Sequence, residues 1–150
     1  KKFKNFQIYH SYSKDISFLE DYAYLISASL DLADATLEMS YRLNAKKLCE
    51  DVLKKFYIKE KKIFQKNQIF KNDIFCEPVD ISDHTISNGN SIMLSNFSRL
   101  GMLEEAKELA DSLNGYLNIY KNYMLSSLRA IDYFETISSG KKCNDEGCEI

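Results

Sequence analysis

Apolar residues recur at helical spacing through most of the chain. One proline and five glycines interrupt the 150 residues, which is typical of helices joined by short turns. The expected helices cover residues 17–37, 41–56, 90–100, 103–113 and 122–137. The segment "KKIFQKNQIF" at 61–70 alternates weakly between apolar and polar positions and is compatible with a short hairpin. The pattern therefore predicts an all-α fold.

The width of the apolar face alternates from one expected helix to the next. The first helix carries two apolar stripes, one through Leu19, Tyr22 and Ile26 and another through Leu25 and Leu32. The second and fourth helices have one apolar face each, whereas the third and fifth are broadly apolar. Because short turns make consecutive helices antiparallel neighbours, we expect helical hairpins in two layers, with the broadly apolar helices inside. An α/α solenoid or a closed α/α toroid has this arrangement.

Composition and charge narrow the class of protein. The chain is 45% hydrophobic and 28% charged with a net charge of -2, which indicates one globular domain that buries roughly 70% of its unfolded surface. The densest basic run, "KEKKIFQK" at 59–66, is brief and is typical of a solvated loop. No apolar stretch approaches the roughly 20 residues of a membrane helix. We therefore expect a cytoplasmic domain with neither nucleic acid nor membrane as a partner.

The four cysteines contain no CxxC motif. The nearest pair, Cys143 and Cys148 in "CNDEGC", has four residues between its thiols. A disulfide or a metal clip is one interpretation, and reduced thiols in a flexible tail over 139–150 are the other. We expect the second. No metal-binding cluster, phosphate loop or nucleophilic triad is found, so we expect no cofactor or metal.

Two segments resemble a known family. They are "FLEDYAYLISASLDLADAT" at 18–36 and "DHTISNGNSIMLSNFSRLG" at 83–101, separated by a basic amphipathic helix and a long loop. In this order they resemble the C-terminal part of the YyaL and spermatogenesis-associated family of thioredoxin-domain-containing proteins. The resemblance covers roughly residues 10–138 and implies a partial (α/α)6 toroid of the six-hairpin glycosidase type. Residues 1–138 would then be a C-terminal toroid segment, with the rest of the parent chain, including a thioredoxin-like domain, as its partner.

Two adjacent carboxylates begin the first motif. "SFLE" at 17–20 fits a capping box, in which Ser17 and Glu20 satisfy each other's backbone N–H groups, and this is one explanation of Glu20. Asp21 follows at the mouth of an apolar stripe, where it gains from the helix dipole. The resemblance offers a functional alternative, because N-terminal ends of inner helices line the toroid cavity. A partly desolvated Asp21 there is a candidate acid with a raised pKa.

The second motif also has two interpretations. Asn88 or Asn90 fits an N-cap, with Gly89 permitting a tight turn. The resemblance implies instead that amide and hydroxyl groups here contact sugar hydroxyls, and that His84 acts as an acid or base, as in epimerases of this general fold. The candidate catalytic residues are Asp21, Glu20 and His84. The candidate substrate-binding residues are Tyr24, Asp83, Asn90 and Ser91.

Two functions remain open from the sequence. The first is a carbohydrate-processing or carbohydrate-binding segment, since six-hairpin relatives hydrolyse or epimerise sugars and tyrosines such as Tyr24 suit stacking on a sugar. The second is a non-catalytic helical module that supports the thioredoxin-like domain. Five helices would also leave lateral apolar faces of a ring uncovered, which predicts self-association through the helix at 122–137, with Tyr123, Phe134 and Ile137.

Overall fold

The computed structural model describes residues 8–10, 17–67 and 79–140, together with the backbone of 143–144 and 147–148. The helices are α1 (Leu19–Thr36), α2 (Met39–Lys55), α3 (Gly89–Leu100), α4 (Leu103–Tyr120) and α5 (Leu125–Ser138), with a 3₁₀ turn, η1 (Lys121–Tyr123), before α5. The short strands are β1 (Tyr57–Ile58), β2 (Ile63–Phe64), β3 (Cys143–Asn144) and β4 (Gly147–Cys148). The prediction of an all-α fold is confirmed.

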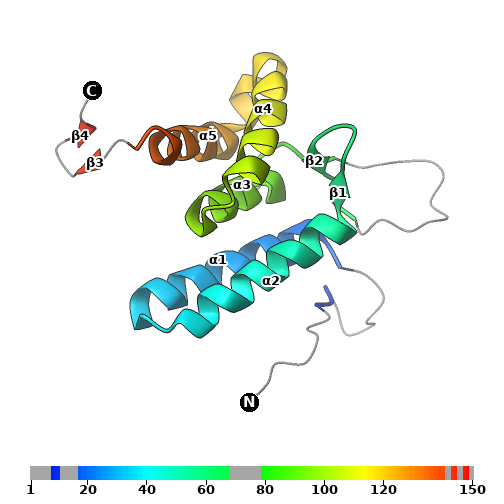
Figure 1. The fold of residues 1–150 in the computed structure, drawn as a ribbon. Helices are drawn as coiled ribbons and strands as arrows, with labels where there is room; N and C mark the ends of the chain where they lie inside the picture. The colour runs from blue at the N-terminus through cyan, green and yellow to red at the C-terminus, as the bar shows by residue number, and fades with distance from the viewer. Residues whose placement is uncertain (1–7, 11–16, 68–78, 141–142, 145–146, 149–150) are drawn as a thin grey trace.

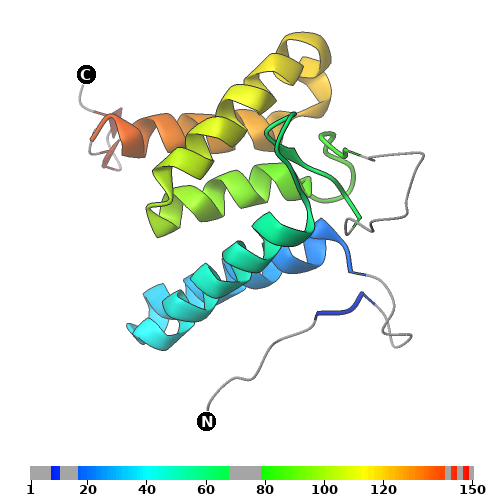
Figure 2. The same cartoon turned by 45° about the vertical axis from the view of Figure 1, so that its right-hand side comes forward.

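Helix α3 lies at the centre, between the α1/α2 pair and the α4/α5 pair (Figures 1 and 2). Most of its side chains are buried, including Met93, Leu94 and Phe97. The aromatic rings of Phe64 and Phe97 lie 6.0 Å apart between their centroids, so β2 contributes to the same core. The two helical hairpins are therefore joined through α3.

The second apolar stripe of α1 is not covered. Leu19, Tyr22 and Ile26 of the first stripe are buried, but Leu25 is 42% exposed and Leu32 is 46% exposed. The prediction that both stripes are covered is therefore wrong for this chain. The physical reason is that α2 and α3 both contact the first stripe and its flanks, and the remaining face of α1 meets solvent.

Glycine ends one helix and is tolerated inside another. Gly101 has a φ of 73° and terminates α3 with a left-handed cap, and the N–H of Met102 donates to the carbonyl of Phe97 at 3.0 Å. Helix α4 instead runs through Gly115 to Tyr120, beyond the predicted end at 113. Its apolar face continues through Tyr116 and Leu117, which pack against the core and offset the weak helix propensity of glycine.

The β-hairpin lies closer to the N-terminus than the sequence pattern predicts. β1 and β2 pair antiparallel with Tyr57 opposite Phe64 and Ile58 opposite Ile63, whereas the prediction placed the hairpin at 61–70. Residues 68–70 of that range lie outside the described residues. In the expected tail, β3 and β4 also pair, with Cys143 opposite Cys148.

The N-terminal ends of α1, α3 and α5 meet at one end of the molecule. The N–H of Leu19 donates to the carbonyl of Lys66 at 2.9 Å, and Gly89 lies against the Leu19 side chain. At the other side of α3, the amide of Asn88 contacts the hydroxyls of Ser126 and Ser127. We call the first turns of α1, α3 and α5, with the loop at 79–88, the shared N-terminal end. Within the described residues, no helix combines the length and apolar character needed to cross a membrane.

Candidate functional site

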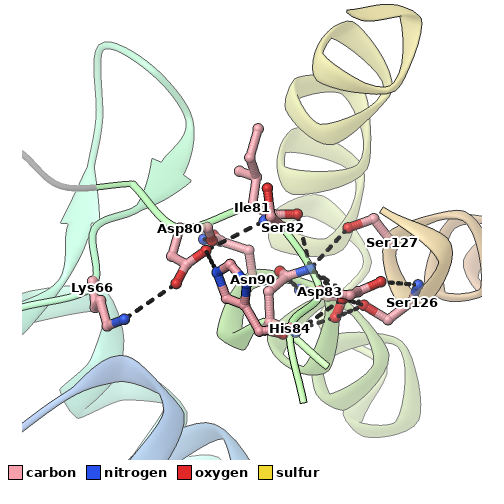
Figure 3. Close-up of polar contacts among 11 residues, drawn as sticks. Lys66, Asp80, Ile81, Ser82, Asp83, His84, Asn90, Ser126 and Ser127 are labelled. Atoms are coloured by element: carbon pink, nitrogen blue, oxygen red, sulfur yellow. Dashed lines mark hydrogen bonds and ion pairs between the residues drawn. The ribbon is translucent and has the colours of Figure 1, made fainter. Parts of the chain in front are cut away.

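A carboxylate ties the loop at 79–88 to helix α5 (Figure 3). The backbone N–H of Ser126 donates to Oδ2 of Asp83 at 2.7 Å, and the Ser126 hydroxyl donates to Oδ1 of Asp83. The backbone and side-chain nitrogens of Asn88 add bonds of 3.2 and 3.0 Å. Partial burial raises the pKa of Asp83, but these bonds together outweigh it and hold the pKa below its ordinary value. Asp83 is therefore an ionised side chain that links the start of α3 to the start of α5.

Asn88 caps helix α3. Its Oδ1 accepts from the N–H of Ser91 at 2.9 Å, which confirms the prediction of an N-cap in this motif and selects Asn88 over Asn90. The hydroxyl of Ser91 lies 2.8 Å from both the carbonyl of Asn88 and the hydroxyl of Ser126. Ser91 and Asn88 thus belong to the same polar cluster as Asp83.

Asn90 points into the protein. Its Oδ1 accepts from the N–H of Phe64 at 3.0 Å, and its Nδ2 donates to the carbonyls of Phe64 at 3.0 Å and Asp80 at 3.1 Å. The residue is 0% exposed. Asn90 therefore joins β2 and the loop at 79–88 to α3, and this arrangement offers no amide group to a ligand.

The two carboxylates of the first motif have exchanged the roles that the sequence predicts. Helix α1 begins at Leu19 with Phe18 as N-cap, so the predicted capping box of Ser17 and Glu20 is wrong by one position. Asp21 takes the contact instead, because its Oδ2 accepts from the N–H of Phe18 at 3.0 Å. Glu20 is partly buried, and this burial raises its pKa against the opposing effects of its own backbone N–H and the charge of Lys66.

The two described histidines each face an aspartate at this end. Nδ1 of His10 lies 3.0 Å from Oδ1 of Asp21, and Nε2 of His84 lies 3.8 Å from Oδ1 of Asp80. Oδ2 of Asp80 also accepts from Nζ of Lys66 at 3.2 Å (Figure 3). The His84 side chain is 72% exposed. It therefore reaches solvent beside the acidic groups rather than lying in an enclosed site.

Sequence reasoning did not single out His10, Lys66 or Asp80. None of them belongs to a helical stripe or a spaced motif, and each reaches the site from a segment outside the helices. The signal that could have found them is charge complementarity, since Lys66 pairs with Asp80 of the loop at 79–88 and His10 contacts Asp21 in the acidic first turn of α1. That signal alone does not indicate which pairs form.

A hollow of about 320 Å³ opens between α3 and α5. Helix α3 and the loop before it contribute Ser87, Ser91, Ile92 and Ser95 to its lining. Helix α5 contributes Ser126, Arg129, Ala130 and Tyr133. The hydroxyl of Tyr24, one helical turn after Glu20, donates to the carbonyl of Ser87 at 3.1 Å. The predicted residues Tyr24 and Ser91 thus both reach the edge of this hollow, and Glu20 lies on the adjoining turn of α1.

No group of three His, Cys, Asp or Glu side chains is placed to hold a metal ion in the parts of the chain that the structure describes. A comparison with models of known protein families finds no match, and a comparison with curated protein sequences finds none either. The family resemblance therefore rests on the two sequence motifs.

Proposed function

We propose that the chain is a segment of a six-hairpin α/α domain whose shared N-terminal end binds or processes a carbohydrate. The observation that carries this proposal is that α1, α3 and α5 begin at one end, where the first turns of α1 bring Glu20 and Tyr24 and the loop at 79–88 brings His84. Helices α1, α3 and α5 contact one another in a row, with α2 and α4 alongside. This order supports two hairpin layers, in which the starts of the inner helices would face the ring cavity.

Glu20 is the proposed proton donor. Burial raises the pKa of Glu20, and the nearby charges of Asp80 and Asp21 act in the same direction. A carboxyl group with a raised pKa keeps its proton closer to neutral pH, as a general acid at a glycosidic oxygen must. Asp21 would hold the helix start in place through its bond to the Phe18 N–H, which leaves the acid role to Glu20.

The test is a glycan screen combined with one isosteric variant. The full-length parent protein and this chain are screened for binding and hydrolysis of neutral and acidic oligosaccharides. The Glu20→Gln variant should lose turnover while still binding, because the amide cannot donate the required proton. Glu38→Gln, at an exposed position near the opposite end of α1, is the matched control and should behave like the wild type. Unchanged turnover in Glu20→Gln would contradict the acid role.

A second candidate is a non-catalytic module that supports the thioredoxin-like domain of the parent protein. It is favoured by the polar groups of Asp83, Asn88 and Asn90, which are largely committed to hydrogen bonds inside the chain. The isolated thioredoxin-like domain would then bind this chain directly, measured by titration calorimetry. Saturable binding of that domain, combined with no glycan binding by the full-length protein, would select this alternative.

A further inference from the structure

The hollow between α3 and α5 has a polar wall whose hydrogen-bond directions can be assigned. Asp83 is held ionised, so the Ser126 hydroxyl must donate its hydrogen to that carboxylate. The Ser91 hydroxyl has one hydrogen, which it donates to the carbonyl of Asn88 at 2.8 Å, and its oxygen also lies 2.8 Å from the hydroxyl of Ser126. The Ser91 oxygen therefore keeps lone-pair capacity and has no spare hydrogen.

Ser95 presents the same chemistry one turn further along α3. Its hydroxyl donates to the carbonyl of Ser91 at 3.3 Å, which also leaves the oxygen as an acceptor. Two neighbouring acceptors on one wall suit a ligand that donates O–H groups, as the hydroxyls of a sugar do. They do not suit a simple inorganic anion, which would bring its own lone pairs against theirs.

The opposite wall carries a cation and an aromatic ring. Arg129 is the charged residue among those that line the hollow, and its guanidinium has donors only, which suits a carboxylate or a phosphate. Tyr133, one turn further along α5, lines the hollow and is 42% exposed, and an aromatic side chain of this kind can stack on a pyranose. A volume of about 320 Å³ lies at the lower end of the range for small-molecule sites and suits one sugar unit.

We propose that this hollow binds a monosaccharide unit that carries an anionic substituent, either a carboxylate or a phosphate ester. Arg129 binds the anion, and the oxygens of Ser91 and Ser95 accept from sugar hydroxyls. This inference rests on the proposed carbohydrate function and specifies the class of sugar. The hollow also adjoins Tyr24, whose bond to Ser87 links it to the helix turn that bears Glu20.

The experiment titrates the chain with D-glucuronate, D-glucose 6-phosphate, D-glucose and inorganic phosphate, with affinity measured by calorimetry. At least one of the two anionic sugars should bind about tenfold or more tightly than both glucose and phosphate, as one charge-assisted interaction predicts. The comparison of glucuronate with glucose 6-phosphate identifies the anion. Arg129→Gln should remove the preference for the anionic sugar, and Arg129→Lys should restore part of it. Lys46→Gln, at an exposed position on α2, is the charge-matched control and should change nothing.

Each contrary outcome has a distinct meaning. Equal affinity for glucose and the anionic sugars, or no effect of Arg129→Gln, would overturn this inference and leave the carbohydrate function standing. Phosphate binding as tight as that of glucose 6-phosphate would show a simple anion site and would also overturn it. The absence of binding by all four compounds would overturn it too, and a parallel screen of neutral oligosaccharides would then decide the proposed function separately.

Discussion

Ser126 donates both its backbone N–H, at 2.7 Å, and its hydroxyl to the carboxylate of Asp83. The two residues are 43 positions apart in the sequence, and their contact joins the loop before α3 to the first turn of α5. Asn88 binds the same carboxylate and caps α3, so one side chain organises the starts of two helices. The shared N-terminal end depends on this contact.

Asp83→Asn should lower the free energy of unfolding by about 1–2 kcal/mol at pH 7, because the amide oxygen replaces a charged acceptor of several hydrogen bonds. Urea denaturation measures the change. Asp132→Asn, at an exposed position on α5, is the matched control and should stay near the wild type. A loss in Asp83→Asn no larger than in the control would show that the contact does not stabilise the fold.

The same pair predicts a pH dependence. The folded-state pKa of Asp83 lies below its ordinary value of 3.8, so its stabilisation is complete above that pH and is lost as the pH falls through the folded-state pKa. The stability difference between the wild type and Asp83→Asn should therefore shrink below about pH 4. Denaturation curves from pH 2 to pH 7 for both proteins test this, and a difference that stays constant would contradict it.

Glu20→Gln should raise the free energy of unfolding at pH 7. Burial raises the folded-state pKa of Glu20 above its ordinary value of 4.5, so ionisation is harder in the folded protein than in the unfolded chain. The stabilisation contributed by the Glu20 carboxyl is complete below pH 4.5 and is lost as the pH rises through its folded-state pKa. The neutral amide of the glutamine variant avoids that loss. Thermal unfolding at pH 4 and pH 7 measures the effect. A variant less stable than the wild type at pH 7 would show that the charged carboxylate has a stabilising partner.

Asn90→Ala should cost about 2–4 kcal/mol, because it leaves the buried N–H and carbonyl of Phe64 and the carbonyl of Asp80 without this partner. Chemical denaturation measures the loss. Asn114→Ala, at an exposed position in α4, is the control and should be neutral or slightly stabilising. If both variants lost the same stability, the buried amide would have no special role.

Gly89→Ala and Gly115→Ala should have opposite effects. A Cβ atom on Gly89 would lie 2.9 Å from carbon atoms of the buried Leu19 side chain, so α1 and α3 must separate or repack, at a cost of about 1–3 kcal/mol. A Cβ atom on Gly115 meets open space in the middle of α4, and alanine there should stabilise by about 0.5–1 kcal/mol. If Gly89→Ala were as stable as the wild type, the contact between α1 and α3 would be looser than described.

Local signals in the sequence predicted the helices, their all-α class and two of their ends. Asn88 and Gly101 were predictable as caps because each acts within a few residues of its own position. The end of α4 was not, because Gly115 resembles a stop signal until the core contacts of Tyr116 and Leu117 are known. Tertiary packing overrides propensity at that position.

The sequence predicted which segments form the site, but it did not predict the role of each side chain in it. The motifs that contain Glu20, Asp83 and Asn90 do lie together, but the direction of each side chain depends on partners elsewhere in the chain. A shift of one residue in the start of α1 gives the capping contact to Asp21 and leaves Glu20 with the raised pKa. The hollow was not predictable, because its walls combine α3 and α5 at a spacing set by their packing.

The most direct test of a carbohydrate site at the shared N-terminal end is amide chemical-shift mapping of the labelled chain. Neutral sugars, glucuronate and glucose 6-phosphate are added separately at millimolar concentration. We predict that at least one sugar shifts amides of residues 19–24, 87–95 and 125–133, with little change in α2 or in the C-terminal half of α4. The absence of any shift, or shifts confined to α2 and the C-terminal half of α4, would contradict the account.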